Sequence, residues 1–404
     1  MGLNLGYGLG FVKFEPPENF QILMPEELPA ADGSEIERAM DESLGQDLAD
    51  YGGRGRSASI LVSDITRPSP SPIMLAPLAK KLKELGFYDL LVVFALGTHR
   101  RMTLDEEKLL LRDFSDMPHL QHDPKKCVVL GKTKRGTPVE IFEIVASTDL
   151  IIATGNIEYH YYAGYSGGAK AVLPGVSSER SVNTNHELMR DPRAVSGRLD
   201  SPVRQDFEDA AGIAGLDYIL NVVLNSKKEV VRAVAGDFIK AHRAGAAVVD
   251  QMYRKTVKSA EIVITCAGGR PKDINLFQAQ KALDNAKGAA APGGTIILLA
   301  ECSEGLGHPV FERWVREAEC AEDCIERFGR EYEFGGHKAA FLAKESLEHN
   351  IILVSSLPRE LAEMCFFQPA STLDEAMAAA YKRHGKDASM LIMPYGNLTL
   401  ATKG

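Results

Sequence analysis

Short apolar runs rich in β-branched residues alternate along this chain with longer segments whose apolar residues recur every three or four positions. The short runs are typical of buried strands and the longer segments of amphipathic helices, so the alternation predicts parallel sheets with crossover helices. The strands predicted in the first half are Ser59–Val62, Leu90–Phe94, Cys127–Leu130, Leu150–Ala153 and Tyr218–Leu224. Helices are predicted over Ile73–Leu85, with Pro72 near the start, and over Asp237–Tyr253, with Asp237 as the N-cap.

The same alternation begins again near residue 258, with predicted strands at Ile262–Thr265, Thr295–Ala300, Ile351–Val354 and Met390–Met393 and a helix at Asp273–Ala286. A chain of 404 residues is too long for a single core. We therefore predict an α/β protein of two α/β domains with mainly parallel sheets and an active-site crevice between them. The expected domains are residues 1–257 and 258–394, followed by a tail, residues 395–404, for which a return to the first domain is open.

Composition excludes several classes of protein. Hydrophobic residues make up 45% of the chain and charged residues 25%, as in ordinary globular proteins, and the net charge of -9 disfavours nucleic acid or an anionic membrane as a partner. No apolar run approaches the roughly 18 residues of a membrane span, and the N-terminus does not resemble a signal peptide. We expect a cytoplasmic protein whose six scattered cysteines are reduced; Cys320 and Cys324 lack the second ligand pair of a zinc site.

Polar residues that could do chemistry follow three of the predicted strands. Asp64 and Arg67 follow the first, His99 the second, and the segment from Gly155 to His160 follows Leu150–Ala153. Because ligands bind beyond the carboxyl ends of parallel strands, we expect these loops to converge on one rim. A turn salt bridge between Asp64 and Arg67, and a hydrogen-bonded turn role for His99, are the structural alternatives.

The stretch from His160 to His186 combines two imidazoles with Lys170 and the pair Gly167-Gly168. Glycines let the backbone approach a ligand closely, histidines carry protons or bind metals, and a lysine held nearby can become a covalent anchor. In the second half, Gln278 and Lys281 lie three apart on the predicted helix and hence on one face. That face points either into the crevice or into solvent.

These motifs together resemble the lactate racemase family, in the same order and over nearly the whole chain. The resemblance rests on Ser63-Asp64-Ile65-Thr66-Arg67-Pro68, Gly97-Thr98-His99-Arg100 with Met102-Thr103, His160 with Ala163 to Lys170 and Leu173-Pro174-Gly175, and Pro271 to Leu276. It implies a nickel pincer nucleotide, a pyridinium mononucleotide with sulfur substituents that is tethered to a lysine and holds nickel. Loading of this cofactor would need cofactor-building proteins as partners.

The resemblance also implies a role for each matching residue. Lys170 matches the tethering lysine, His186 the nickel ligand, and His99 and His160 the pair of acid/base histidines that face opposite sides of the substrate. The remaining matches are to cofactor or substrate contacts: Asp64, Gly167 and Gly168 on the cofactor side, and Arg67, Gln278, Lys281 and Phe277 on the substrate side.

The implied reaction inverts the C2 carbon of a 2-hydroxy acid by hydride transfer to and from the cofactor, through a 2-keto acid. Phe277 stands where the resemblance leads us to expect a tyrosine, and the sole tryptophan, Trp314, lies in a charged helical stretch. We therefore expect a 2-hydroxy acid other than lactate as the substrate, with a larger or sugar-derived acid as a candidate. Two other hypotheses stay open: a zinc-dependent lyase or hydrolase using His99, His160 and His186, and a non-catalytic paralogue that binds an organic acid or nucleotide.

Overall fold

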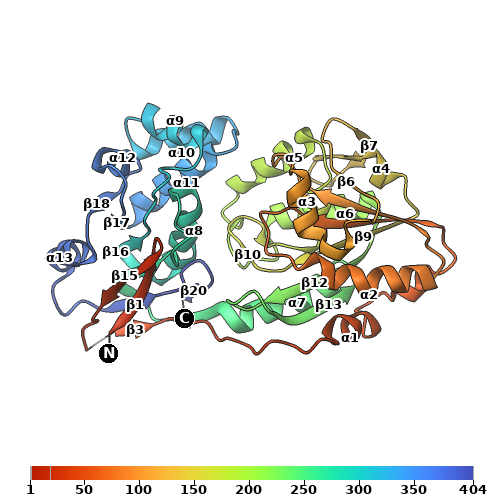
Figure 1. Cartoon of the computed structure of the whole chain (residues 1–404). Helices are drawn as coiled ribbons and strands as arrows, with labels where there is room; N and C mark the ends of the chain where they lie inside the picture. The colour runs from red at the N-terminus through yellow and green to blue at the C-terminus, as the bar shows by residue number, and fades with distance from the viewer. Residues whose placement is uncertain (1, 19, 404) are drawn as a thin grey trace. The chain divides into compact units, whose positions relative to one another are not determined.

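The computed structural model describes residues 2–18 and 20–403, which form two compact units. One unit consists of residues 27–252, and the other combines residues 1–26 with residues 253–404. Each unit has its own sheet with helices packed around it, so the expected fold class of two α/β domains with mainly parallel sheets is confirmed (Figure 1). None of the described helices is long and apolar enough to cross a membrane.

The unit of residues 27–252 contains a six-stranded sheet of order β13-β12-β9-β4-β5-β6, in which only β13 is antiparallel to its neighbour. Its strands are β4 (Ser57–Ser63), β5 (Asp89–Ala95), β6 (His119–Gln121), β9 (Leu150–Asn156), β12 (Leu216–Leu224) and β13 (Val230–Gly236). Two small hairpins, β7 (Cys127–Lys132) with β8 (Pro138–Phe142) and β10 (Tyr159–His160) with β11 (Gly164–Tyr165), lie outside it. The predicted strand at residues 127–130 therefore exists, but it belongs to a hairpin.

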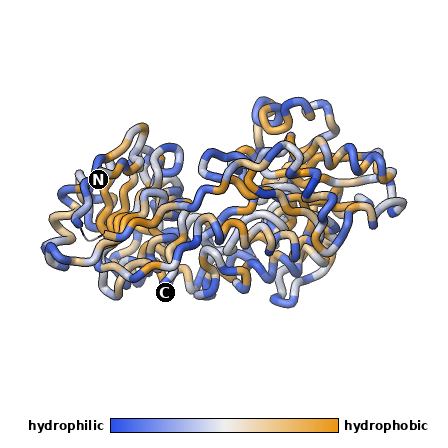
Figure 2. Tube along the Cα trace, turned by 90° about the horizontal axis from the view of Figure 1, so that it is seen from below, coloured by the Kyte–Doolittle hydropathy of each residue, from blue (hydrophilic) through white to orange (hydrophobic). Residues whose placement is uncertain are grey.

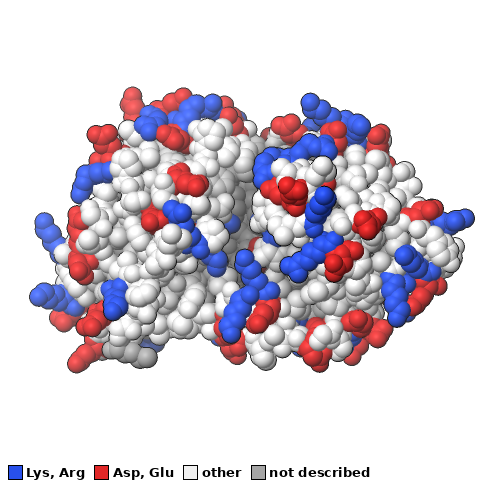
Figure 3. Space-filling model, in the orientation of Figure 1, with Lys and Arg blue, Asp and Glu red and all other residues white. Residues whose placement is uncertain are grey.

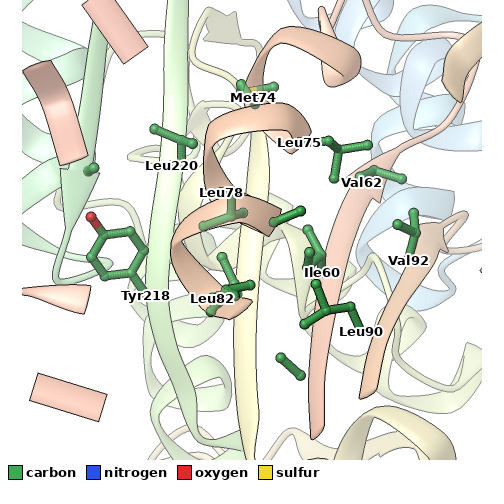
Figure 4. Packing of buried hydrophobic residues seen from close by; sticks show 14 of the residues in the cluster. Ile60, Val62, Met74, Leu75, Leu78, Leu82, Leu90, Val92, Tyr218 and Leu220 are labelled. Atoms are coloured by element: carbon green, nitrogen blue, oxygen red, sulfur yellow. The ribbon is translucent and has the colours of Figure 1, made fainter. Parts of the chain in front are cut away.

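The helices of this unit are α1 (Glu35–Asp41), α2 (Ser71–Glu84), α3 (Leu104–Leu111), α4 (Glu143–Ala146), α5 (Glu179–His186), α6 (Pro202–Ala214) and α7 (Lys240–Tyr253), with short 3-10 helices η1 (Leu48–Tyr51), η2 (Arg112–Phe114), η3 (Gly168–Ala171) and η4 (Glu187–Arg190). Figure 4 shows α2 packing Met74, Leu78 and Leu82 against the strands. These residues recur every four positions and are fully buried, which is why this segment forms an amphipathic helix.

The other unit contains a six-stranded, entirely parallel sheet of order β18-β17-β16-β15-β19-β3. Its strands are β3 (Phe20–Ile22), β15 (Ala260–Cys266), β16 (Ala290–Leu299), β17 (Asn350–Val354), β18 (Gln368–Ala370) and β19 (Met390–Met393). The pair β1 (Leu3–Tyr7) and β2 (Gly10–Phe14) is antiparallel, and the pair β14 (Arg254–Val257) and β20 (Leu400–Lys403) is parallel. Figure 2 shows hydrophobic stretches gathered within each unit and hydrophilic stretches along its outside.

The helices of this second unit are α8 (Leu276–Ala286), α9 (Pro309–Glu317), α10 (Ala321–Arg330), α11 (Gly336–Glu348), α12 (Arg359–Met364) and α13 (Leu373–His384), with the 3-10 helix η5 (Lys287–Ala289). The helix expected at Asp273 begins instead at Leu276, where Asn275 caps it through the Gln278 amide. The Asp273 carboxylate accepts a hydrogen bond from the Gly8 amide, 2.7 Å away, and so joins the N-terminal hairpin to this unit.

These units correct the expected division of the chain at residues 257 and 258. Residues 1–26 belong with residues 253–404, because β3 adds to the edge of the second sheet beside β19. The tail, residues 395–404, also stays in this unit, because β20 pairs with β14. Short edge strands of this kind carry too weak a pattern to reveal which sheet they join.

Candidate functional site

Three polar loops follow the carboxyl ends of adjacent strands in the unit of residues 27–252. β4 lies between β5 and β9 and is parallel to both, so the residues after Ser63, Ala95 and Asn156 emerge at one edge of the sheet. The loop after β5 is fixed to the segment after Lys170, because the Gly97 amide donates to the Gly175 carbonyl, 2.8 Å away. The expected convergence of the loops on one rim is therefore present.

Asp64 and His99 form a direct pair at this edge. His99 Nδ1 lies 2.5 Å from Asp64 Oδ2, and Asp64 Oδ1 accepts from both the amide and the hydroxyl of Thr66. Burial by itself would raise the pKa of Asp64, but the hydrogen bonds from His99 and Thr66 and the charge of Arg67 outweigh it and lower the pKa to about 2. The carboxylate is ionised and holds one nitrogen of His99, so the other nitrogen is directed away from Asp64.

Lys170 lies in η3 directly after the glycine pair. The residue keeps some accessible surface, but burial of its amine, reinforced by the charges of Arg67 and Arg204, holds its pKa well below the ordinary 10.5. A neutral amine is a nucleophile and is therefore the form that can take a covalent group.

His186 is the last residue of α5 and is buried. Burial lowers its pKa to about 3, so the imidazole is neutral at pH 7 and can bind a metal. Its Nε2 lies 2.6 Å from the hydroxyl of Tyr162, and burial raises the pKa of that tyrosine, which keeps the hydroxyl protonated and able to donate. His160, the last residue of β10, meets the same Tyr162 edge-on with ring centroids 4.4 Å apart. Tyr162 thus contacts two of the predicted site histidines.

The glycine pair is a tight cradle. Gly167 and Gly168 have φ values of 73° and 59°, in the left-handed region, and a Cβ on Gly168 would lie 2.8 Å from the His242 ring. The Gly168 amide donates to Asn221 Oδ1, 2.7 Å away, and His242 Nε2 donates to the Ser166 carbonyl, 2.8 Å away. The segment that carries Lys170 is therefore fixed by contacts on both sides.

Arg204 also stabilises the segment that carries Lys170. It is fully buried and donates to the carbonyls of Ala163, Tyr165 and Gly167. Burial lowers its pKa to about 10, which leaves it charged at neutral pH. Sequence analysis does not single out Arg204 or His242, because each lies in a helix far along the chain and only the fold brings it to the loop.

Three predicted substrate residues lie in the other unit, on the first two turns of α8. Lys281 Nζ donates to Gln278 Oε1 at 3.0 Å, which confirms that the two side chains share a face. Phe277 lies beside them, and its ring stacks on His308 with centroids 5.5 Å apart. Phe277, Gln278 and Lys281 are all partly exposed.

The three site histidines do not form a metal-binding group of their own. Over the described part of the chain, the residues whose ligand atoms come within 4.8 Å of one another are Glu345, Glu348 and His349, and His99, His160 and His186 are not such a group. The hypothesis of zinc held directly by these three histidines therefore has no geometric support. All six cysteines are free thiols, as expected, and Cys320 is exposed while Cys324 is buried. Figure 3 shows acidic and basic side chains interspersed on the surface.

Comparison with known proteins gives concordant matches to both halves. The family model described as the lactate racemase N-terminal domain matches residues 7–197, and that of the lactate racemase C-terminal domain matches residues 255–400. Lactate racemase of Thermoanaerobacterium thermosaccharolyticum is 34% identical over 89% of this chain and 88% of its own length. Lactate racemase of Lactiplantibacillus plantarum is 30% identical over 89% of each chain.

Solved structures agree with these matches. The lactate racemase apoprotein of T. thermosaccharolyticum superposes with a TM-score of 0.93 at 30% identity, covering 99% of this chain and 100% of that one. A Thermotoga maritima protein superposes with a TM-score of 0.68 at 19% identity over 94% of this chain and 100% of its own, a likeness of fold alone.

Proposed function

The chain belongs to the lactate racemase family and is an isomerase, and from this we propose that it is a racemase or epimerase that inverts the C2 carbon of a 2-hydroxy acid through a 2-keto acid. The observation that carries the proposal is the arrangement after β4 and β5. There His99, held by the Asp64 carboxylate, follows β5, while Lys170, whose amine has a strongly lowered pKa, and His186, a neutral imidazole, belong to the neighbouring segments.

We propose a nickel pincer nucleotide, covalently attached to Lys170, as the cofactor. The residues fit such a group: the lowered pKa of the Lys170 amine favours its neutral, nucleophilic form, His186 is a neutral imidazole suited to nickel, and the glycine cradle admits a backbone approach. When bound, the group supplies a reversible hydride acceptor. Asp64, predicted to contact the cofactor, hydrogen-bonds His99, and we therefore propose that it acts mainly through that histidine.

We propose that the two other site histidines, His99 and His160, transfer the protons. With Nδ1 held by Asp64, His99 is left with Nε2 to take the proton from the substrate hydroxyl. We propose that His160 does the same for the mirror-image substrate. Two bases on opposite sides of a planar keto acid allow both stereoisomers to form.

The substrate carboxylate needs cationic partners. We propose that Arg67 binds it with its planar fork and that Lys281, oriented by Gln278, contributes a point charge. Phe277 would contact the rest of the substrate. Because this position offers an apolar ring in place of a hydroxyl, we propose a 2-hydroxy acid other than lactate as the preferred substrate, with lactate as the reference compound.

The first experiment is to produce the chain together with cofactor-building proteins and to measure intact mass, nickel content and racemisation of 2-hydroxy acids. We expect added mass on the peptide that contains Lys170, near-stoichiometric nickel, and loss of both in Lys170→Ala. The matched control is Lys134→Ala, since Lys134 is an exposed lysine of the same unit. Unmodified protein under these conditions, or full racemisation by Lys170→Ala, would refute the proposed function.

A further inference from the structure

The C-terminal end of α11 carries a group of possible metal ligands that contains none of the candidate site residues. Ligand atoms of Glu345, Glu348 and His349 all lie within 4.8 Å of one another. Glu345 and Glu348 belong to the last turn of α11, and His349 is its C-cap residue, directly before β17. Residues three and four positions after Glu345 share its face of the helix, so this spacing brings the three side chains together.

Two ligand atoms of this group are buried and have no hydrogen-bond partner. They are Oε2 of Glu345 and Nδ1 of His349, which lie 3.8 Å apart, too far for a hydrogen bond between them. Glu345 is 7% exposed, and the side chain of His349 is 9% exposed. A buried polar atom without a hydrogen bond costs free energy, and a metal ion bound by both atoms would offset that cost.

The charges around the group favour a cation. Lys287, from the neighbouring 3-10 helix η5, forms ion pairs with Oε1 of Glu345 at 3.2 Å and with Asp284 at 2.6 Å. The ammonium group is therefore shared between two carboxylates, and it pairs with the oxygen of Glu345 that is not directed at His349. Of these side chains and Glu348, three are acidic and one is a lysine. The carbonyl end of α11, a helix of 13 residues, adds partial negative charge at the same place.

We propose that Glu345, Glu348 and His349 bind a zinc ion that joins the end of α11 to the start of β17, independently of the proposed reaction. One imidazole and two carboxylates form a ligand set of nitrogen and oxygen that suits zinc, and a water molecule would complete the four-coordinate shell. Magnesium and calcium take six or more oxygen ligands and would bind far more weakly here. Because Glu348 is exposed, the ion can enter from solvent.

The test is calorimetric titration of the full-length protein, first freed of metal with a chelator, with ZnCl2 and with MgCl2. The variants Glu348→Gln and His349→Gln each remove one ligand, and Glu326→Gln, at an exposed position of α10, is the matched control. Loss of a group that only supports a metal ligand costs roughly tenfold to a hundredfold in affinity, so each ligand variant should bind zinc at least about tenfold more weakly. The control should bind zinc as the wild type does.

Thermal unfolding gives a second readout that is specific to this unit. The sole tryptophan, Trp314, lies in α9, which packs against α11, so its fluorescence follows the unfolding of the unit that holds the proposed zinc site. A ligand that binds only the folded state raises Tm. Saturating zinc should raise Tm by several degrees in the wild type and in Glu326→Gln, and by much less in Glu348→Gln and His349→Gln. Zinc bound to histidines of the other unit is common to all four proteins and cancels in this comparison.

Three results would overturn the inference. Zinc affinity that neither ligand variant changes would show that zinc binds elsewhere, and magnesium binding as tight as zinc binding would exclude a site selective for a transition metal. A wild type that binds no zinc would leave the ion pairs of Glu345 with Lys287 and His349 as the whole role of the group. If His349→Gln does not fold, the exposed position of Glu348→Gln lets that variant decide alone. None of these results bears on the mass and nickel measurements that test the proposed function.

Discussion

A buried lysine held near its titration point has a measurable thermodynamic cost, and Lys338 provides the sharpest prediction. Its pKa is lowered from the ordinary 10.5 to about 7, mainly by burial and then by Lys281. At about 1.4 kcal/mol per pH unit, this change costs the folded state about 5 kcal/mol when the lysine is charged in both states, that is, below pH 7. Lys338 is 1% exposed, so little solvent screening reduces the figure.

The direction in which this stability cost changes with pH follows from proton binding. Between pH 7 and 10.5 the unfolded chain binds a proton that the folded protein has released, so the penalty shrinks as the pH rises. We expect Lys338→Met to raise the free energy of unfolding by several kcal/mol at pH 6, up to about 5 kcal/mol, and by only about 2 kcal/mol at pH 9. Loss of the cation–π contact with Phe277 subtracts about 1 kcal/mol at pH 6, where the folded lysine is charged, and little at pH 9, where its amine is neutral.

The single tryptophan of the chain supplies the assay. Trp314 is 1% exposed, and its indole nitrogen donates to Glu333 at 3.1 Å, within the same unit as Lys338. Its fluorescence during urea unfolding therefore reports this unit alone, and Lys344→Met is the control for removal of a surface charge. A Lys338→Met variant that is no more stable than wild type at pH 6, or whose gain does not fall by pH 9, would refute this reasoning.

Further predictions concern three variants in the unit that carries Lys170. Asp64→Asn should destabilise that unit by about 2 kcal/mol at pH 7. The difference in stability from wild type should shrink as the pH falls from about 4 to 2, because the stabilisation from a lowered carboxyl pKa is lost on protonation. Denaturant unfolding at several pH values measures this difference, and a difference that does not change with pH would contradict the prediction. The same variant should lower kcat at least about tenfold through loss of His99 orientation, with little change in KM. Arg204→Met should cost about 3 kcal/mol in denaturant unfolding, because three buried carbonyls lose their donor; exposed Arg135→Met, the control, should cost little. Gly168→Ala should reduce mass addition at Lys170 far more than Gly136→Ala, since both glycines have a left-handed φ but only a Cβ at Gly168 meets another side chain. Equal mass addition in the two variants would contradict this, because it would show that the contact with the side chain has no effect on attachment at Lys170.

Much of the architecture could be predicted from local patterns. The strands that precede Asp64, His99 and His160 are short, largely buried and mainly apolar runs, and the alternation of strand and helix favours parallel pairing. The division of the chain could not be predicted, because β3 is a three-residue edge strand whose place beside β19 depends on long-range pairing. Local propensity also placed the start of α8 too early, since Asp273 is used in a contact with Gly8.

For the candidate site, too, some features could be predicted from the sequence and others could not. The sequence by itself determined which residue types were present and that their loops would meet at one edge, because strand direction fixes where each loop emerges. Only the tertiary structure decided their chemical states: it paired Asp64 with His99, buried Lys170 and His186 so that the pKa of each is lowered, and brought Arg204 to the carbonyls of the glycine loop. It also brought Lys338 to Phe277, sixty-one positions apart in the sequence. A pKa depends on burial and on charges from distant segments, and neither is fixed until the chain has folded.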